Sequence, residues 1–178
     1  LKNRSEWSQI RNARMKEKLI EVPASVTPLK TIEEGVIPQK DDPIFKHNFK
    51  GQVQRGGRKE ALKILDSFLD QRGKGYLSNI SAPGDSEIHG SRISPHLTWG
   101  TISSKEVQNF INIKRENLLD NEKKRWKKNL TAFTSRLSWR CHFIQKLETQ
   151  PSIEVQCMHQ LYEGLREKEF NYELYNAW

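Results

Sequence analysis

The sequence predicts an all-α fold, and three observations support this prediction. Apolar residues recur at helical spacing over long stretches, no stretch alternates as a half-buried strand would, and Gly and Pro separate the periodic stretches. A length of 178 residues is enough for one domain with a core, but only 35% of the residues are hydrophobic and 29% are charged. Because the mean hydropathy of −0.81 is low, we expect either an extended, solvated part or a core completed by sequence outside this chain.

The first 56 residues are predicted to be a basic helix followed by an interdomain linker. Residues 1–20 place Trp7, Ile10 and Arg14 near one face of a short amphipathic helix. The next stretch, 22–57, has four prolines and few periodic apolar residues, which is typical of an extended segment on a domain surface. Its isolated apolar residues are expected to anchor it: Val26, Leu29, Ile37, Phe45 and Phe49. Disorder of this segment is the alternative.

Residues 57–178 are predicted to form a helical domain. Apolar spacing predicts helices over 58–72, 103–118, 122–149 and 153–165, and a proline at position 95 predicts a short helix through Trp99. Ser103 and Glu106 form a capping-box pattern at the start of the second long helix. The polar stretch 73–90 is predicted to be a loop, and loops of this length are usually functional or mobile.

The net charge and the two cysteines indicate which partners and which cellular compartment to expect. A net charge of +8 favours a polyanionic partner such as nucleic acid, although a generic basic surface is equally compatible with it. Cys141 and Cys157 show no metal-ligand spacing and are predicted to be reduced, buried thiols of a cytoplasmic protein. The sequence has no apolar run long enough to cross a membrane and no signal peptide.

One short stretch has the residue types of a phosphate-binding turn: Gly90, Ser91, Arg92, Ile93 and Ser94, which precede a proline. A pyrophosphate needs several donors that converge from a tight turn, and this stretch offers backbone N–H groups, two hydroxyls and a guanidinium. The alternative is structural: Ser94 would cap a proline-initiated helix, and Arg92 would be a surface charge.

A second candidate lies on the long helix 122–149, where Trp139 sets an aromatic ring beside Arg140. The alternative is an interface aromatic residue next to a solvated charge. Earlier in the same helix, the basic run 123–128 could contact DNA phosphates, and such binding would weaken steeply with salt. A solvated helix face is the alternative for this run.

The block Ser91–Gly100 resembles the Ser/Thr-Arg-Leu-Ser-Pro-x-Leu-x-x-Gly block in the flavin domain of DNA photolyases and cryptochromes. The resemblance covers about residues 57–178. It implies that the residues Gly90 to Ser94 bind the pyrophosphate of FAD, and that Tyr76 lines the same end of the cofactor. It also implies that residues 1–56 join an N-terminal antenna domain to the flavin domain. We therefore expect a fragment that lacks this antenna domain and the second half of the flavin domain.

The stretch around Trp139 is similar to the Leu-x-Trp-Arg-Glu-Phe helix of the same family. The resemblance implies that Trp139 stacks on a lesion turned out of DNA and that Arg140 lies between cofactor and substrate. Three positions depart from the family pattern: Arg136 replaces an acidic residue, Cys141 replaces a Glu, and His142 replaces an aromatic residue. Arg136 and Arg140 are four apart, so they share a helix face and repel each other unless an anion lies between them.

The resemblance implies an enzyme of the carbon–carbon lyase type for the complete protein, a deoxyribodipyrimidine photolyase. In this family, excited reduced FAD donates an electron to a pyrimidine dimer that has been flipped out of the duplex. The departure at Arg136 favours a cryptochrome-type photoreceptor that keeps FAD and lacks repair. A cofactor-free helical module that binds nucleic acid is a third reading, based on the net charge and the basic run.

Overall fold

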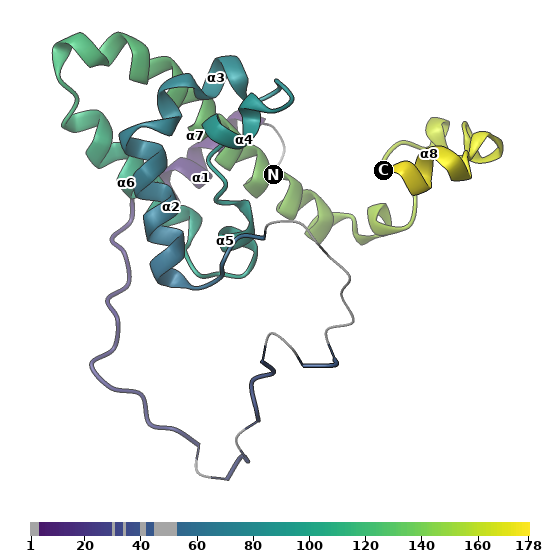
Figure 1. Cartoon of the computed structure of the whole chain (residues 1–178), viewed down its shortest axis with the longest axis horizontal. Helices are drawn as coiled ribbons and strands as arrows, with labels where there is room; N and C mark the ends of the chain where they lie inside the picture. The colour runs from purple at the N-terminus through teal and green to yellow at the C-terminus, as the bar shows by residue number, and fades with distance from the viewer. Residues whose placement is uncertain (1–3, 30, 34, 40–41, 45–52) are drawn as a thin grey trace. The chain divides into compact units, whose positions relative to one another are not determined.

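The computed structural model describes residues 4–29, 31–33, 35–39, 42–44 and 53–178. Within these ranges the regular structure is helical and there is no strand, which confirms the all-α prediction (Figure 1). Four helices have more than ten residues: α1 (Arg4–Lys16), α2 (Arg58–Asp70), α6 (Ser104–Glu116) and α7 (Asp120–Thr149). The chain divides into two compact units, a first unit (Leu1–Leu130) and a second unit (Thr131–Trp178).

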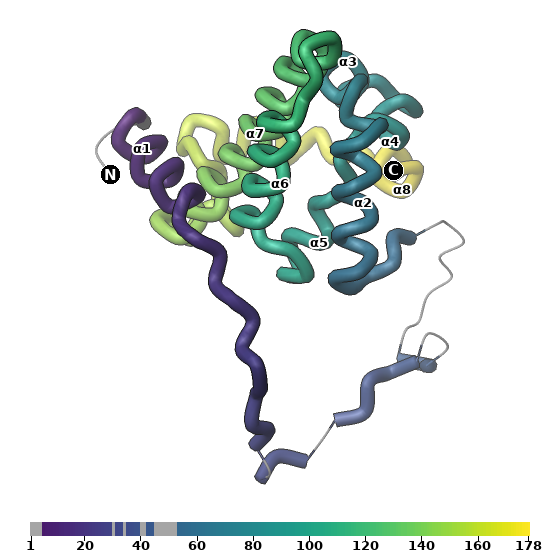
Figure 2. Tube along the Cα trace, turned by 90° about the vertical axis from the view of Figure 1, so that its left-hand side faces the viewer, coloured from purple at the N-terminus to yellow at the C-terminus, as the bar shows by residue number. Residues whose placement is uncertain are grey.

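The core of the first unit lies between α2, α6 and the first part of α7. Figure 2 shows α2 and α6 side by side, and the two helices are in contact. Their fully buried apolar residues, together with those of α7, are Ala61, Leu65, Phe68, Val107, Ile111, Trp126 and Leu130. Gly73 follows α2, and a Cβ there would lie 2.7 Å from the carbonyl oxygen of Phe68, so the close packing at the end of α2 requires glycine.

Helix α1 packs against α6 in the first unit. It ends at Lys16, four residues earlier than predicted, and Lys105 of α6 holds the chain beyond it. The Lys105 Nζ atom lies 3.2 Å from Glu17 Oε2 and donates to the carbonyl oxygen of Lys18 at 3.1 Å. The two compact units meet within α7, between Leu130 and Thr131. The predicted domain boundary between residues 56 and 57 stays a prediction.

The segment predicted to be a linker lacks helix where it is described, as expected, but its apolar residues there do not anchor it. The described residues between Glu17 and Gly57 contain no helix or strand. However, Val26, Leu29 and Ile37 are exposed, so they do not anchor the segment. The other two predicted anchors, Phe45 and Phe49, lie outside the described residues.

The prediction of a loop over residues 73–90 is wrong. This stretch forms short helical turns: η1 (Arg72–Gly75), α3 (Tyr76–Asn79) and α4 (Asp85–His89). Buried Asn129 of α7 fixes them, since its Oδ1 accepts the N–H of Leu77 at 2.7 Å and its Nδ2 donates to the carbonyl oxygen of Lys74 at 3.0 Å. Single turns of this kind carry no amphipathic period, and their partner lies some fifty residues away, so local sequence could not predict them.

Helix α5 (Ser94–Thr98) and the start of α6 agree with the predictions. The hydroxyl of Ser103 accepts the N–H of Glu106 at 3.1 Å, and the carboxylate of Glu106 accepts the N–H of Ser103 at 2.9 Å. Both hydrogen bonds of the predicted capping box are therefore present.

The second unit contains the end of α7 and a segment in which the predicted helix 153–165 is absent. The segment has three single 3-10 turns, η2 (Pro151–Glu154), η3 (Gln160–Tyr162) and η4 (Glu167–Glu169), and ends in α8 (Tyr172–Ala177). Its side chains are almost all exposed, so an amphipathic helix here would have no buried contacts to stabilise it. Local hydrogen bonds compete as well, because Glu163 accepts the N–H of Cys157 at 2.9 Å.

The predicted apolar stripe of α7 is buried only in part. Phe133 and Leu137 are buried, whereas Ile144 and Leu147 are more than two-fifths exposed. Cys141 is half-buried and Cys157 is exposed, so the prediction of two buried thiols is wrong. Among the described residues, every helix is too short or too polar to cross a bilayer.

Candidate functional site

The turn Ser91–Ser94, between α4 and α5, has a backbone conformation suited to an anion. Arg92 has a φ of 55°, in the left-handed region that residues other than Gly and Asn rarely adopt. Ile93 follows in the right-handed helical region, with φ −87° and ψ −12°. A left-handed residue next to a right-handed one directs successive N–H groups to one side, which forms an anion-binding concavity.

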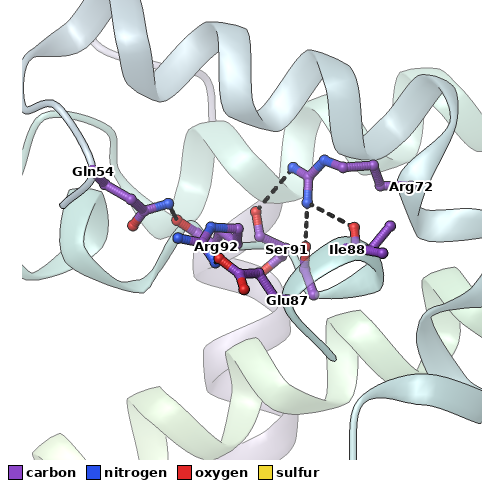
Figure 3. A network of polar contacts seen from close by, with 7 residues as sticks. Gln54, Arg72, Glu87, Ile88, Ser91 and Arg92 are labelled. Carbon is purple, nitrogen blue, oxygen red and sulfur yellow. Dashed lines mark hydrogen bonds and ion pairs between the residues drawn. The ribbon is translucent and has the colours of Figure 1, made fainter. Parts of the chain in front are cut away.

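The carbonyl oxygens of Ser91 and Arg92 accept hydrogen bonds from two side chains (Figure 3). The guanidinium of Arg72, just after α2, donates to the carbonyl oxygens of Gly90 and Ser91 and also reaches that of Ile88. It is fixed from the other side by the carbonyl oxygen of Ile64 at 2.8 Å. Gln54 Nε2 donates to the carbonyl oxygen of Arg92 at 3.0 Å. These hydrogen bonds fix the orientation of the carbonyl groups of Ser91 and Arg92.

The N–H groups of the turn remain available. Within the part of the chain that the structure describes, the N–H groups of Ser91, Arg92, Ile93 and Ser94 donate to no backbone or side-chain acceptor. The hydroxyls of Ser91 and Ser94 also make no hydrogen bond to a described residue. Four backbone donors and two hydroxyls on one short turn can bind a phosphate group.

Arg72 is the residue of this site that the sequence did not reveal. Its pKa is lowered, first by burial and second by the nearby charge of Arg92, because both disfavour a further positive charge. A bound anion would offset the positive charges of Arg72 and Arg92. An Arg at the end of a helix is ordinary in a sequence, and its contacts with the turn span about twenty residues, so no local signal marks it.

The other predicted residues of the turn have separate structural roles. The side chain of Ile93 is buried in the core, so only its N–H can face a ligand. A Cβ at Gly90 would lie 2.5 Å from the carbonyl oxygen of Ser86, which makes glycine necessary there. Arg92 pairs with Glu87 at 3.2 Å on the surface. Ser94 is the first residue of α5 and provides no side-chain cap, so the alternative in which it caps the helix is wrong.

Tyr76 lies in the core and is only 4% exposed. Its ring meets that of Phe68 edge to face, with a centroid distance of 5.4 Å. The structure therefore gives Tyr76 a packing role between α2 and α3, and its predicted contact with a cofactor stays a prediction.

The second candidate cluster lies on α7 in the second unit. The guanidinium of Arg136 lies over the ring of Trp139, 4.6 Å from its centroid, and Trp139 is 48% exposed. Phe143 meets Trp139 edge to face at 6.5 Å. Arg136 thus stacks on Trp139, a contact that the predicted pairing of Arg136 with Arg140 on one helix face did not include. The exposed aromatic and cationic groups can bind a nucleobase or a phosphate.

The basic run 123–128 is mostly a solvated face. Lys123 pairs with Asp120 at 2.7 Å, and Lys124 and Lys128 are exposed. Trp126, within the run, belongs to the core, where Lys114 Nζ lies 4.8 Å from the centre of its ring. The exposed lysines are available to DNA phosphates, but their spacing on one helix is also that of an ordinary solvated surface.

The described residues contain no cluster of His, Cys, Asp or Glu that could hold a metal ion. No protein-family model matches the sequence, and neither a curated protein nor a solved structure matches it. The functional interpretation therefore depends on the geometry of the two clusters and on the sequence motifs.

Proposed function

We propose that this chain is the FAD-binding segment of a light-driven DNA repair flavoprotein of the deoxyribodipyrimidine photolyase type. One observation carries the proposal: the turn Ser91–Ser94 presents four consecutive N–H groups and two hydroxyls without acceptors among the described residues. Arg72 and Gln54 donate to the carbonyl oxygens of Ser91 and Arg92. This donor set fits a diphosphate, which offers several acceptor oxygens to one compact turn. The motif Ser91–Gly100 supports FAD as the diphosphate compound.

The residues of this chain have distinct parts in the proposal. Gly90 to Ser94 hold the pyrophosphate, with Arg92 adding charge, and Arg140 lies toward the reacting end of the cofactor. Trp139 supplies a stacking surface for a base turned out of DNA, and Arg136 contacts a phosphate. When bound, reduced FAD supplies light-driven electron donation. Two free thiols agree with a reducing compartment, and we include a cytoplasmic location in the proposal.

Titration of FAD, followed by quenching of flavin fluorescence, tests the proposal. We expect micromolar binding to the wild type and a roughly tenfold loss in Ser91→Ala and Arg92→Gly, the size of a charge-assisted hydrogen bond. Glycine is chosen at position 92 because it tolerates the φ of 55° while removing the guanidinium. The matched controls Ser81→Ala and Arg14→Ala, both exposed, should bind like the wild type. Equal binding by all four variants, or no binding to the wild type, would contradict the proposal.

A photoreceptor of the cryptochrome type is the second candidate, and the stacking of Arg136 on Trp139 favours it. This guanidinium covers one face of the ring that a flipped base would use. Illumination of the protein with a dimer-containing oligonucleotide separates the two candidates: flavin binding with dimer splitting supports repair, and flavin binding without splitting supports the photoreceptor.

The exposed lysines of α7 support a third candidate, a helical module that binds nucleic acid without a cofactor. DNA binding that weakens with salt and needs no flavin is the result expected of this candidate.

A further inference from the structure

The phosphate turn (Ser91–Ser94) is held in shape from its carbonyl side. Each N–H group of the turn shares a planar peptide unit with the carbonyl of the preceding residue, and in a trans peptide the two groups point in opposite directions. A donor that fixes such a carbonyl therefore also fixes the direction of the N–H group on the other side of the unit. Since the N–H groups of the turn have no acceptor among the described residues, these carbonyl contacts determine where they point.

Three of the four peptide units are fixed by elements of the helical core. Arg72 donates to the carbonyl oxygens of Gly90 and Ser91. The carbonyl oxygen of Ile93 accepts the N–H of Leu97 at 3.0 Å, within α5. These hydrogen bonds direct the N–H groups of the residues that follow each carbonyl.

The fourth peptide unit, between Arg92 and Ile93, is fixed by the linker. Gln54 Nε2 donates to the carbonyl oxygen of Arg92 at 3.0 Å, although the two residues are 38 positions apart (Figure 3). The φ of 55° at Arg92 is unfavourable for an arginine, so the local backbone preference does not hold this unit in place. Gln54 therefore directs the N–H of Ile93 toward a ligand without touching the ligand itself.

The linker end (residues 53–57) has few other attachments. Residues 53 and 55–57 are exposed, and a cavity of about 380 Å³ lies between the linker end and α5. A Cβ at Gly56 or Gly57 would meet no atom within 4 Å, so the chain has room to pivot just before α2. Among the described residues, Gln54 makes the only hydrogen bond between the linker end and the turn. The linker end can thus leave the turn without unfolding α2.

We propose that Gln54 is a positioning residue of the phosphate turn and couples the linker end to its ligand: a bound phosphate group tightens the linker end on the turn, and release of the phosphate loosens it. An anion at the N–H of Ile93 polarises the peptide unit and strengthens the carbonyl of Arg92 as an acceptor for Gln54. The coupling is reciprocal, because the factor that Gln54 adds to phosphate affinity is also the factor by which phosphate favours the docked linker end. This inference rests on the proposed phosphate site and adds a residue and a regulation to it.

Calorimetric titration of the full chain with inorganic pyrophosphate measures the effect of Gln54 on affinity. We expect Gln54→Met, which has a similar length and no donor, to bind about fivefold more weakly than the wild type, the size of one hydrogen bond. Gln39→Met, at another exposed position of the linker, is the matched control and should bind like the wild type. Because the hydrogen bond of Gln54 is exposed, Gln54→Met should keep the Tm of the wild type, which excludes a loss of folding as the cause.

Tryptic cleavage after Arg55 measures the effect of the ligand on the linker, because the protease must draw the linker end away from the turn. Saturating pyrophosphate should slow this cleavage about fivefold in the wild type and leave it unchanged in Gln54→Met. Cleavage after Lys18, near the other end of the linker, should not respond to pyrophosphate in either protein. A purely structural role of Gln54 would not produce this ligand-dependent difference.

Equal pyrophosphate affinity of Gln54→Met and wild type, cleavage after Arg55 that does not respond to pyrophosphate, or no binding of pyrophosphate to the wild type would overturn the proposal. The same experiments with FAD separate it from the proposed function. If pyrophosphate produces both effects and FAD does not bind, the flavin function fails and the coupling stands. If FAD binds equally to Gln54→Met and the wild type, the coupling fails and the flavin function stands.

Discussion

At the residue scale, the carboxylate of Glu106 both caps the N-terminus of α6 and binds Arg58 of α2. It caps the N–H of Ser103 and accepts a hydrogen bond from Arg58 of α2 at 2.6 Å. The hydrogen bond from Arg58 is the main cause that lowers the pKa of Glu106 below its ordinary 4.5. A carboxylate with a lowered pKa in the folded state stabilises the fold above pH 4.5, and this stabilisation disappears as the pH falls through the folded-state pKa.

We therefore expect Glu106→Gln to lower the free energy of unfolding at pH 7, and the difference from wild type to shrink toward pH 3. Urea denaturation at several pH values measures this. Glu116→Gln, on the exposed face of the same helix, is the control and should follow the wild type at each pH. A difference between Glu106→Gln and wild type that does not change with pH would show that the charge of Glu106 is unimportant.

The same residues show what sequence can and cannot predict. Ser103 and Glu106 are three apart, so their mutual hydrogen bonds follow from local geometry and the pattern predicted them. Arg58 is 48 residues from Glu106, and only the packing of α2 on α6 brings the two together. Likewise, the residue types of the turn Ser91–Ser94 indicated a phosphate site, but the availability of its N–H groups depends on Arg72, whose position no local pattern gives.

At the scale of elements, predictions succeeded where a helix buries a long amphipathic face. The apolar faces of α2 and α6 are buried in the core, and both helices lie close to the predicted bounds. The predicted helix 153–165 has a similar apolar pattern but no buried side chain among the described residues, and it forms isolated turns instead. Periodicity therefore predicts a helix only where tertiary contacts stabilise it.

Helix α1 presents a further test at this scale, because it buries a charge. Arg11 is 8% exposed; its NH1 donates to Asn12 Oδ1 at 3.2 Å, and its Nε and NH2 have no partner among the described residues. A buried cation without a carboxylate costs free energy, so a long apolar side chain of similar shape should be more favourable. We expect Arg11→Met to raise Tm by about 2–4 °C, which corresponds to about 1 kcal/mol for a chain of this size.

Thermal unfolding followed by circular dichroism measures this change in Tm. Arg14→Met, on the exposed side of α1, is the control and should leave Tm nearly unchanged. A lower Tm in Arg11→Met would show that Arg11 binds an acceptor in solution.

At the scale of the whole molecule, the candidate residues are divided between the two units. The phosphate turn belongs to the first unit, whereas Arg136 and Trp139 belong to the second. The sequence predicted both groups from their motifs, but it gave no information about this division, since α7 continues through the boundary at Thr131 without a Gly or Pro. Flavin binding through the turn and base stacking on Trp139 can therefore be measured as separate properties.

The two units are also expected to differ in how strongly their backbone amides are protected from hydrogen exchange. Helices α2 and α6 enclose buried apolar residues, whereas residues 151–178 have almost no buried side chain, and their amide bonds lie in single turns. Segments with few buried apolar contacts open with a free energy near zero, while core helices open only with global unfolding. In hydrogen–deuterium exchange, we expect peptides from 151–178 to be fully exchanged at the earliest time point and those from α2 and α6 to stay protected. Protection of 151–178 would instead show that its apolar side chains are covered in solution, and a dependence on protein concentration would identify a second copy of the chain as the cover.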